Sequence, residues 1–287
     1  MSTRATAKKT MNRIELLDKG VSILTDAGFE EAKTDAMLLM EYICGADRNE
    51  LFLHGDVEVT GEMEEAFLRA VEKRLTHIPV QHITGVQNFM GLDFKVSDKV
   101  LCPRQDTEIL VEEVMRIGLD SMDILDMCTG SGCIILSLLR FSHACRGVGV
   151  DISEEALEIA RANAEALGLD AEFVRSDLFA DLKEGQFDII VSNPPYIRTA
   201  VIDTLMPEVR DHEPHIALDG DEDGLVFYRR ICEEGYDRLR AGGMIFFEIG
   251  YDQADDVRKI MEKSGFDHIE IVKDYGGNDR VAYGVKN

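Results

Sequence analysis

The feature that most constrains the fold is an alternation of strand-like and helix-like segments that begins near residue 105. Apolar runs predict strands, and these are DILDMC (123–128), GVGVDI (147–152), AEFVRSD (171–177), FDIIVSNPP (187–195) and GMIFFEIG (243–250). Segments with helical periodicity separate most of them, and these are 106–119, 133–141, 153–168 and 224–239. Strands that alternate with helices pair in parallel, so we expect an α/β fold with helices on both faces of the sheet.

The end of the chain follows a different pattern. In HIEIVKDYGGNDRVAYGVK (268–286) a glycine turn joins two strand-like runs with no helix between them, so this pair must be antiparallel. The prediction is a Rossmann-like, mostly parallel seven-stranded sheet with an antiparallel terminal hairpin. Class I S-adenosylmethionine-dependent methyltransferases use this arrangement, and plain dehydrogenase domains usually do not.

The sequence before residue 105 predicts a helical bundle and a linker that precede the α/β domain. Residues 1–76 are expected to form a small helical bundle, because apolar residues recur at helical spacing from Ile14 onward. This bundle carries no obvious chemistry, so we expect it to hold a partner or to cover a site, and we predict that residues 14–76 contact a protein substrate. Alternating apolar residues and glycines in 77–104 predict a β-hairpin linker, and 105–287 would be the catalytic domain.

The composition narrows the class of partner. Acidic residues outnumber basic ones 55 to 31, for a formal charge of −24, and such a surface disfavours a nucleic-acid substrate. No apolar run is long enough for a membrane span, and the basic start MSTRATAKKTMNR lacks the apolar core of a secretory signal. The six cysteines form no CxxC pair, which is typical of reduced thiols in a cytoplasmic protein. Nothing in the sequence demands more than a monomer.

A glycine turn follows the first predicted strand of the sheet. Its residues are Cys128, Thr129, Gly130, Ser131 and Gly132, and a helix begins directly after them. Glycines let the backbone approach a ligand closely, and the helix start offers free N–H groups. The turn lacks the full G-x-G-x-x-G spacing that holds a pyrophosphate, and no P-loop lysine is present. On its own, such a turn is equally compatible with a purely structural role.

Two further strand ends support a nucleoside ligand. The next strand ends in Asp151, where an acidic side chain accepts hydrogen bonds from ribose hydroxyls. The third strand ends near Asp177 and Leu178, where an acid commonly faces an adenine amino group, although Asp177 could equally cap a turn. A nucleoside without a diphosphate fits S-adenosyl-L-methionine better than NAD.

The strand FDIIVSNPP ends in Asn193, Pro194, Pro195 and Tyr196, which we call the NPPY tip. Two prolines make it rigid and remove backbone donors. An amide nitrogen is a poor nucleophile, and its methylation needs acceptors on both N–H bonds. The Asn193 side-chain oxygen and the Pro194 carbonyl would supply them, and Tyr196 could stack on the flat acceptor group. We therefore expect catalysis from Asn193, Pro194 and Tyr196, with all four residues binding the substrate.

The NPPY tip, the TGSG turn and Asp151 together resemble amino-methyltransferases, and three further segments narrow the resemblance. PVQHITGVQNFMGLDFKVSDKVLCPRQDTE (79–108), EVRDHEPHIALDGDEDGL (208–225) and NDRVAYG (278–284) are similar to the release factor glutamine methyltransferase family. The resemblance covers nearly the whole chain. It implies methylation of the N5 nitrogen of the glutamine in the GGQ motif of class-1 peptide chain release factors. It also implies that residues 128–132, Asp151 and Asn193 bind S-adenosyl-L-methionine.

The chain departs from the family pattern at three places. Cys128 stands where glycine is usual, Gln105-Asp106 stands where Pro-Glu is usual, and Leu178 replaces an aromatic residue found in some relatives. None of these changes removes a group that the chemistry needs.

Several other functions stay open or are set aside. A glutamine of a ribosomal protein stays open as a substrate, because it would suit the same site. An adenine-N6 methyltransferase is disfavoured, because it would need a basic face. A catalytically idle cofactor sensor is also disfavoured, because it would not need paired hydrogen-bond acceptors. No metal is expected: DGDEDG (219–224) lacks the glutamate of a calcium loop, and HEPH (212–215) lacks a third zinc ligand.

Overall fold

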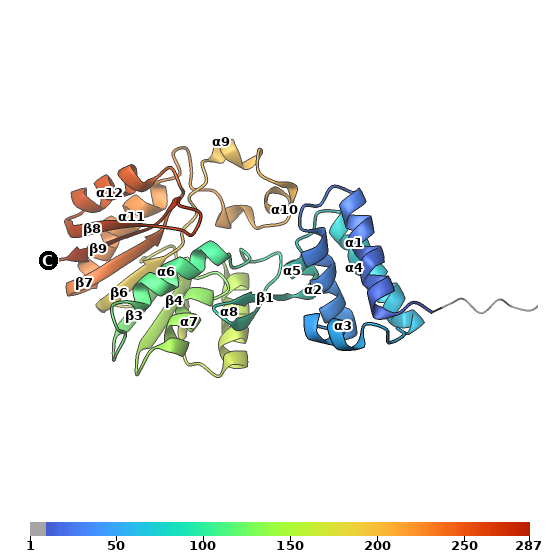
Figure 1. The fold of residues 1–287 in the computed structure, drawn as a ribbon. Coiled ribbons are helices and arrows are strands. Elements are labelled where there is room, and N and C mark those ends of the chain that lie inside the picture. The colour runs from blue at the N-terminus through green and yellow to red at the C-terminus, as the bar shows by residue number, and fades with distance from the viewer. Residues whose placement is uncertain (1–9) are drawn as a thin grey trace, which may run out of the picture. The chain divides into compact units, whose positions relative to one another are not determined.

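The computed structural model describes residues 10–287, and the chain divides into two compact units, Met1–Gly85 and Val86–Asn287 (Figure 1). Most of the basic start MSTRATAKKTMNR, on which the prediction about a secretory signal rests, lies outside the described residues. Among residues 10–287, no helix is both long and apolar enough to cross a bilayer.

The first unit is helical, as the periodicity predicts. Its helices are α1 (Arg13–Asp26), α2 (Ala32–Cys44), α3 (Arg48–His54), α4 (Gly61–Leu75) and α5 (Val80–Thr84). Side chains of Asn12, Asp47 and Thr60 accept hydrogen bonds from the first turns of α1, α3 and α4, which fixes where these helices begin. Helix α5 was not predicted, because its five residues are too few to show a period.

A buried ion pair lies inside this helical unit. The Nε of Arg74 donates to the Asp35 carboxylate at 2.7 Å, and both side chains are buried. The guanidinium also lies 4.3 Å from the ring centroid of Phe29. Removing one partner of such a buried pair destabilises the fold, because the other partner is left as a buried charge without compensation.

The second unit is built on a seven-stranded sheet with the order β5-β4-β3-β6-β7-β9-β8. Its strands are β3 (Asp123–Met127), β4 (Arg146–Asp151), β5 (Glu172–Arg175), β6 (Phe187–Ser192), β7 (Leu239–Glu248), β8 (Phe266–Lys273) and β9 (Asp279–Lys286). Strands β3 to β7 pair in parallel, and β9 pairs antiparallel with β7 and β8. The predicted fold class is confirmed.

Helices cover both faces of this sheet (Figure 1). On one face lie α6 (Gln105–Met115), α7 (Cys133–Phe141) and α8 (Glu154–Leu167), and on the other lie α11 (Val226–Arg238) and α12 (Ala254–Lys263). Alternating strand residues serve the two faces: Ile124 and Phe246 pack with the first set, and Leu125 and Phe247 with the second. Helix α12 was not predicted, although its apolar residues Val257, Ile260 and Met261 recur at helical spacing.

The remaining elements are small. Strands β1 (Val86–Phe89) and β2 (Leu92–Lys95) form the predicted antiparallel hairpin, which Asn163 of α8 holds through hydrogen bonds to the backbone of Lys95. Between β6 and α11 the chain forms α9 (Thr199–Ile202), α10 (Pro207–Arg210) and the short 3-10 helix η1 (His215–Ala217).

The topology creates one switch point in the sheet. From β3 the chain continues outward to β4 and β5, and then returns to the other side of β3 as β6. At such a point the loops at the carboxyl ends of the two central strands diverge and leave a crevice. The glycine turn follows β3 and the NPPY tip follows β6, so both flank this crevice.

Candidate active site

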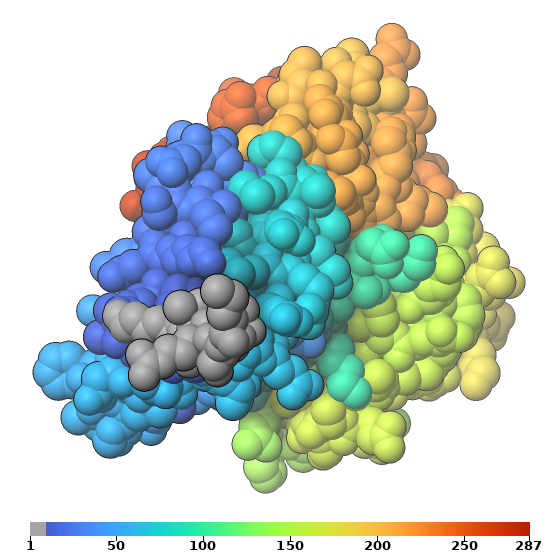
Figure 2. All heavy atoms as spheres, turned by 90° about the vertical axis from the view of Figure 1, so that its right-hand side faces the viewer, coloured from blue at the N-terminus to red at the C-terminus, as the bar shows by residue number. Residues whose placement is uncertain are grey.

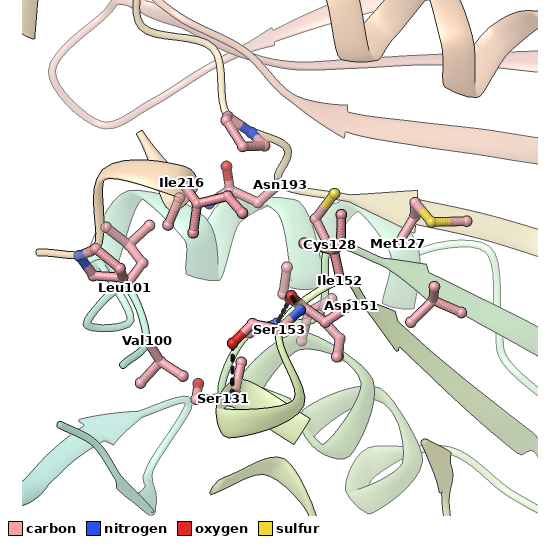
Figure 3. A pocket seen from close by; sticks show the side chains of 18 of the residues that line it. Val100, Leu101, Met127, Cys128, Ser131, Asp151, Ile152, Ser153, Asn193 and Ile216 are labelled. Atoms are coloured by element: carbon pink, nitrogen blue, oxygen red, sulfur yellow. Dashed lines mark hydrogen bonds between the residues drawn. The ribbon is translucent and has the colours of Figure 1, made fainter. Parts of the chain in front are cut away.

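A cavity of about 310 Å³ lies at the carboxyl ends of β3 to β6, within the second unit (Figure 3). Most of the residues predicted for the site line it: Cys128, Thr129, Gly130, Ser131, Asp151, Asp177, Leu178, Asn193 and Pro195. Gly132, Pro194 and Tyr196 lie next to lining residues without lining the cavity themselves. Its volume falls in the range of small-molecule sites.

The glycine turn owes its shape to three residues in the left-handed backbone region. Cys128, Gly130 and Gly132 have φ values of +63°, +55° and +78°. Cys128 is not a glycine, so the turn holds a strained residue at its first position. Gly132 allows α7 to approach α8, because a Cβ there would lie 3.2 Å from the Cβ of Ala160. Burial raises the pKa of the Cys128 thiol far above its usual range, which argues against its acting as a nucleophile.

Asp151 connects the glycine turn to the start of α8. Its Oδ2 accepts a hydrogen bond from the Gly130 N–H and its Oδ1 accepts one from the Ser153 N–H, both at 2.9 Å (Figure 3). Burial raises the pKa of this carboxyl group, and the backbone donors oppose that rise. Each oxygen has lone-pair capacity left for a hydroxyl donor in the cavity.

A second carboxyl group, that of Asp126 near the end of β3, forms hydrogen bonds to the glycine turn and to the start of α7. This residue was not predicted from the sequence. It is fully buried, and its Oδ2 accepts from the Thr129 hydroxyl at 2.6 Å and from the Ile135 N–H at 3.3 Å. Burial raises its pKa to about 7. An acidic residue inside the apolar run DILDMC was the available signal.

The end of β5 contributes two contrasting residues. Asp177 is exposed and pairs with Arg230 of α11 at 3.0 Å. Leu178 is buried in the core beside Phe179, with φ at +53°. Both residues line the cavity, one with a charged and one with an apolar side chain.

The NPPY tip is held by side chains from three distant segments. Asn193 Nδ2 donates to the Thr107 hydroxyl of α6 at 3.3 Å, and the Tyr196 hydroxyl donates to Glu248 Oε1 at 3.2 Å. Gln253 Nε2 donates to the Tyr196 carbonyl at 3.0 Å. Burial raises the pKa of Tyr196 far above its usual range, so its hydroxyl stays protonated. Thr107, Glu248 and Gln253 were not predicted.

Residues 218–225, which we call the backing loop, pack against the rear of the NPPY tip. Ile197 N–H donates to the Leu218 carbonyl at 3.0 Å, and Gly220 N–H donates to the Ile197 carbonyl at 2.8 Å. A Cβ on Gly220 would lie 2.8 Å from the Tyr196 Cα, and one on Gly224 would lie 2.4 Å from the Tyr196 carbonyl oxygen. The glycines of DGDEDG therefore permit close backbone packing.

A further buried carboxylate fixes the cavity rim. Glu213, from the HEPH segment, accepts from the Cys102 N–H at 3.2 Å and from the Arg104 guanidinium at 2.8 Å. Burial raises its pKa, and the nearby Arg104 opposes the rise. Pro214 and Ile216, which follow it, line the cavity.

The fold and the cavity together define a class of protein. A mostly parallel sheet with an antiparallel terminal hairpin, a glycine turn and an acid at the next strand end is the architecture of class I methyltransferases. A family model described as the methyltransferase small domain matches residues 104–208. A crystal structure of a methyltransferase from Pyrococcus furiosus has the same fold, with a TM-score of 0.54, 21% identity, and coverage of 69% of this chain and 91% of that one.

More similar relatives define the family. A family model described as the PrmC N-terminal domain matches residues 15–85. The release factor glutamine methyltransferase of Caulobacter vibrioides is 41% identical, over 92% of this chain and 93% of its own length. That of Agrobacterium fabrum is 43% identical, over 90% of this chain and 92% of its own length. The chain belongs to the release factor glutamine methyltransferase family.

Proposed function

We propose that this protein transfers a methyl group from S-adenosyl-L-methionine to the N5 amide nitrogen of the glutamine in the GGQ motif of class-1 peptide chain release factors. The observation that carries the proposal is the shared cavity, which Asn193 and Pro195 of the NPPY tip line together with Asp151 and residues 128–131 of the glycine turn. Membership of the family supports the choice of release factors as substrates. Because release factors act with ribosomes, we place this activity in the cytoplasm.

The cofactor would lie against the glycine turn. When bound, S-adenosyl-L-methionine supplies an electrophilic methyl group on a sulfonium centre. Residues 128–132 would follow its outline, Asp151 would accept from the ribose hydroxyls, and Asp177 with Leu178 would flank the adenine. The cavity fits such a polar ligand, because Ser131 Oγ is buried on its wall and has no hydrogen-bond partner within residues 10–287.

The glutamine amide would lie against the NPPY tip. Its lone pair is delocalised into the carbonyl, so the tip must hold both N–H bonds and direct the nitrogen at the methyl group. Asn193 Oδ1 and the Pro194 carbonyl would accept these two hydrogen bonds. The nitrogen gains a methyl group and releases one proton. Orientation in a site that excludes water would supply most of the rate.

We also propose that the helical unit binds the protein substrate, with Asn193 and its neighbours receiving only the glutamine. This unit, blue to cyan in Figure 2, exposes large apolar side chains: Phe52 is 88% and Leu53 is 65% exposed, both on α3. Replacing both by serine should raise KM for the release factor about tenfold and leave kcat unchanged. Phe141→Ser, at an exposed phenylalanine of α7, is the matched control.

The test of the function is the transfer of labelled methyl groups from S-adenosyl-L-methionine. Four substrates are offered in parallel: an unmethylated class-1 release factor, its GGQ→GGA variant, a ribosomal-protein mixture and unmethylated duplex DNA. We expect label on the release factor and none on the GGA variant. Label only on ribosomal protein would support glutamine methylation but show that the substrate is a ribosomal protein and not a release factor. Label only on DNA would overturn the proposal.

A further inference from the structure

Three side chains from separate elements form a continuous hydrogen-bond chain beside the cavity. The Thr107 hydroxyl of α6 donates to Glu248 Oε2 at 2.6 Å, and the Asn193 Nδ2 donates to the same hydroxyl at 3.3 Å. Thr107 and Glu248 are each 2% exposed. Only Asn193 and Thr107 line the cavity, so Glu248 acts from behind them.

This chain has a direction that the carboxylate determines. An ionised carboxylate only accepts hydrogen bonds, so the single proton of the Thr107 hydroxyl points to Glu248. The hydroxyl then has only lone pairs to offer Asn193. Asn193 must therefore turn its NH2 group toward Thr107, which leaves Oδ1 on the opposite side of the amide.

Two neighbours of Glu248 favour its ionised form. Burial raises the pKa of Glu248, and the Thr107 hydroxyl and the positive charge of Arg280 oppose that rise. Arg280 pairs with Asp274 at 3.2 Å and with Asp106 at 3.1 Å, so its guanidinium is fixed close to the site.

The other oxygen of Glu248 holds the far end of the same tetrapeptide. Oε1 accepts from the Tyr196 hydroxyl at 3.2 Å, while Oε2 reaches Asn193 through Thr107. One buried carboxylate thus connects to the first and the last residue of the NPPY tip. A group placed in this way can fix both the amide and the aromatic ring relative to each other.

We propose that Glu248 and Thr107 are positioning residues that hold the Asn193 amide with its oxygen toward the substrate nitrogen. The expected effect on methyl transfer rests on the proposed function. If Asn193 were turned the other way, its NH2 group would face the NH2 group of the substrate glutamine, and two donors cannot form a hydrogen bond. In Glu248→Gln the new amide can donate to Thr107. The threonine proton is then free to point at Asn193 and reverse it.

The first experiment compares Thr107→Val with Thr107→Ser in the full-length enzyme. Valine keeps the shape and removes the hydroxyl, so kcat should fall about 10- to 100-fold. KM for the release factor and the Kd of S-adenosyl-L-methionine should change less than about threefold. Serine restores the hydroxyl and should restore kcat. The matched control is Thr204→Val, which removes a hydroxyl that donates to the Val201 carbonyl at 2.6 Å in an exposed turn and should leave kcat unchanged.

The second experiment adds Glu248→Gln alone and together with Thr107→Val. Because the two residues act through one chain, the double variant should lose no more kcat than the larger single loss. Multiplying losses would overturn the proposal. So would a serine variant as slow as the valine variant, since the hydroxyl would then have no special part.

A readout that does not require methyl transfer separates this inference from the proposed function. With asparagine-selective 15N labelling, the Asn193 NH2 signals are identified by their loss in Asn193→Ala. One Nδ2 proton should exchange with water about tenfold faster in Thr107→Val than in wild type, and no faster in Thr107→Ser. Equal exchange in wild type and Thr107→Val would overturn the inference. A wild-type enzyme that transfers no methyl group to release factors would overturn the proposed function, whatever these signals show.

Discussion

Replacing Gly224 by alanine tests whether the backing loop sets the position of the NPPY tip. Gly224 has φ at +73°, and a Cβ there would lie 2.4 Å from the Tyr196 carbonyl oxygen and 2.8 Å from Gln253 Nε2. These two atoms form the hydrogen bond of 3.0 Å that holds the tip. The added methyl group would therefore enter the space of that hydrogen bond.

The size of the effect follows from these distances. Carbon and oxygen atoms approach to about 3.3 Å, so the tip or the loop must move by roughly 0.9 Å. A misplacement of about 1 Å at a reacting group costs about 10²-fold in rate. The left-handed backbone adds a loss of stability of about 1–2 kcal/mol. We expect kcat to fall about 100-fold, with the Kd of S-adenosyl-L-methionine nearly unchanged, because the glycine turn lies on other elements.

Single-turnover methyl transfer and calorimetric titration of the cofactor measure the two quantities. Gly242→Ala is the matched control: its φ is +76°, a Cβ there would meet no atom within 4 Å, and it lies in the amino-terminal half of β7, away from the carboxyl ends of the strands. This control should lose similar backbone stability and keep its kcat. A Gly224→Ala enzyme with wild-type kcat would refute the assignment of the loop as the support of the tip.

Three other predictions concern different parts of the chain. Asn193→Ala should abolish methyl transfer while cofactor binding, measured by calorimetry, is partly retained; unchanged turnover would refute its role. Arg74→Ala should lower the free energy of unfolding in urea by about 3–5 kcal/mol, because it leaves Asp35 buried without its partner. In the exposed pair of Arg69 with Glu65, Arg69→Ala should cost less than about 1 kcal/mol. Burial raises the pKa of Asp126 from 3.8 to about 7, so between these pH values the folded state binds a proton that the unfolded chain has released. This group's contribution to stability therefore falls as pH rises through that window, and Asp126→Asn should gain stability relative to wild type from pH 4 to pH 7; urea midpoints that keep a constant difference would contradict the shift.

The main architecture could be predicted because it depends on local patterns. Every predicted strand of the sheet is present, and the absence of a helix between the two strand-like runs of HIEIVKDYGGNDRVAYGVK correctly indicated the antiparallel hairpin. The NPPY tip and the glycine turn could be placed at one edge because parallel strands share their carboxyl ends. Helix α12 was missed although its sequence carries a signal, because Val257, Ile260 and Met261 recur at helical spacing on one face.

The supporting residues of the site could not be predicted in the same way. Thr107 lies 86 residues before Asn193 and 141 residues before Glu248, and no periodicity connects such positions. A threonine near a helix start most often caps or faces solvent, so its type carries no signal. The sequence did contain a signal for Glu248, because this acidic residue lies within the apolar run GMIFFEIG, where a buried charge needs partners.

Glu248 explains why the site needs elements that bind neither cofactor nor substrate. The NPPY tip can be rigid because of its prolines, but rigidity does not decide which way an amide points. That choice requires a group that accepts and does not donate, and β7 holds the Glu248 carboxylate in this position. The antiparallel strand β9 brings Arg280 to this position, so the terminal hairpin that distinguishes the fold also supplies the positive charge that favours the ionised carboxylate. Arg280→Met should therefore lose part of the kcat that Glu248→Gln loses. A wild-type kcat in Arg280→Met would show that the charge supplied by the terminal hairpin has no effect on catalysis.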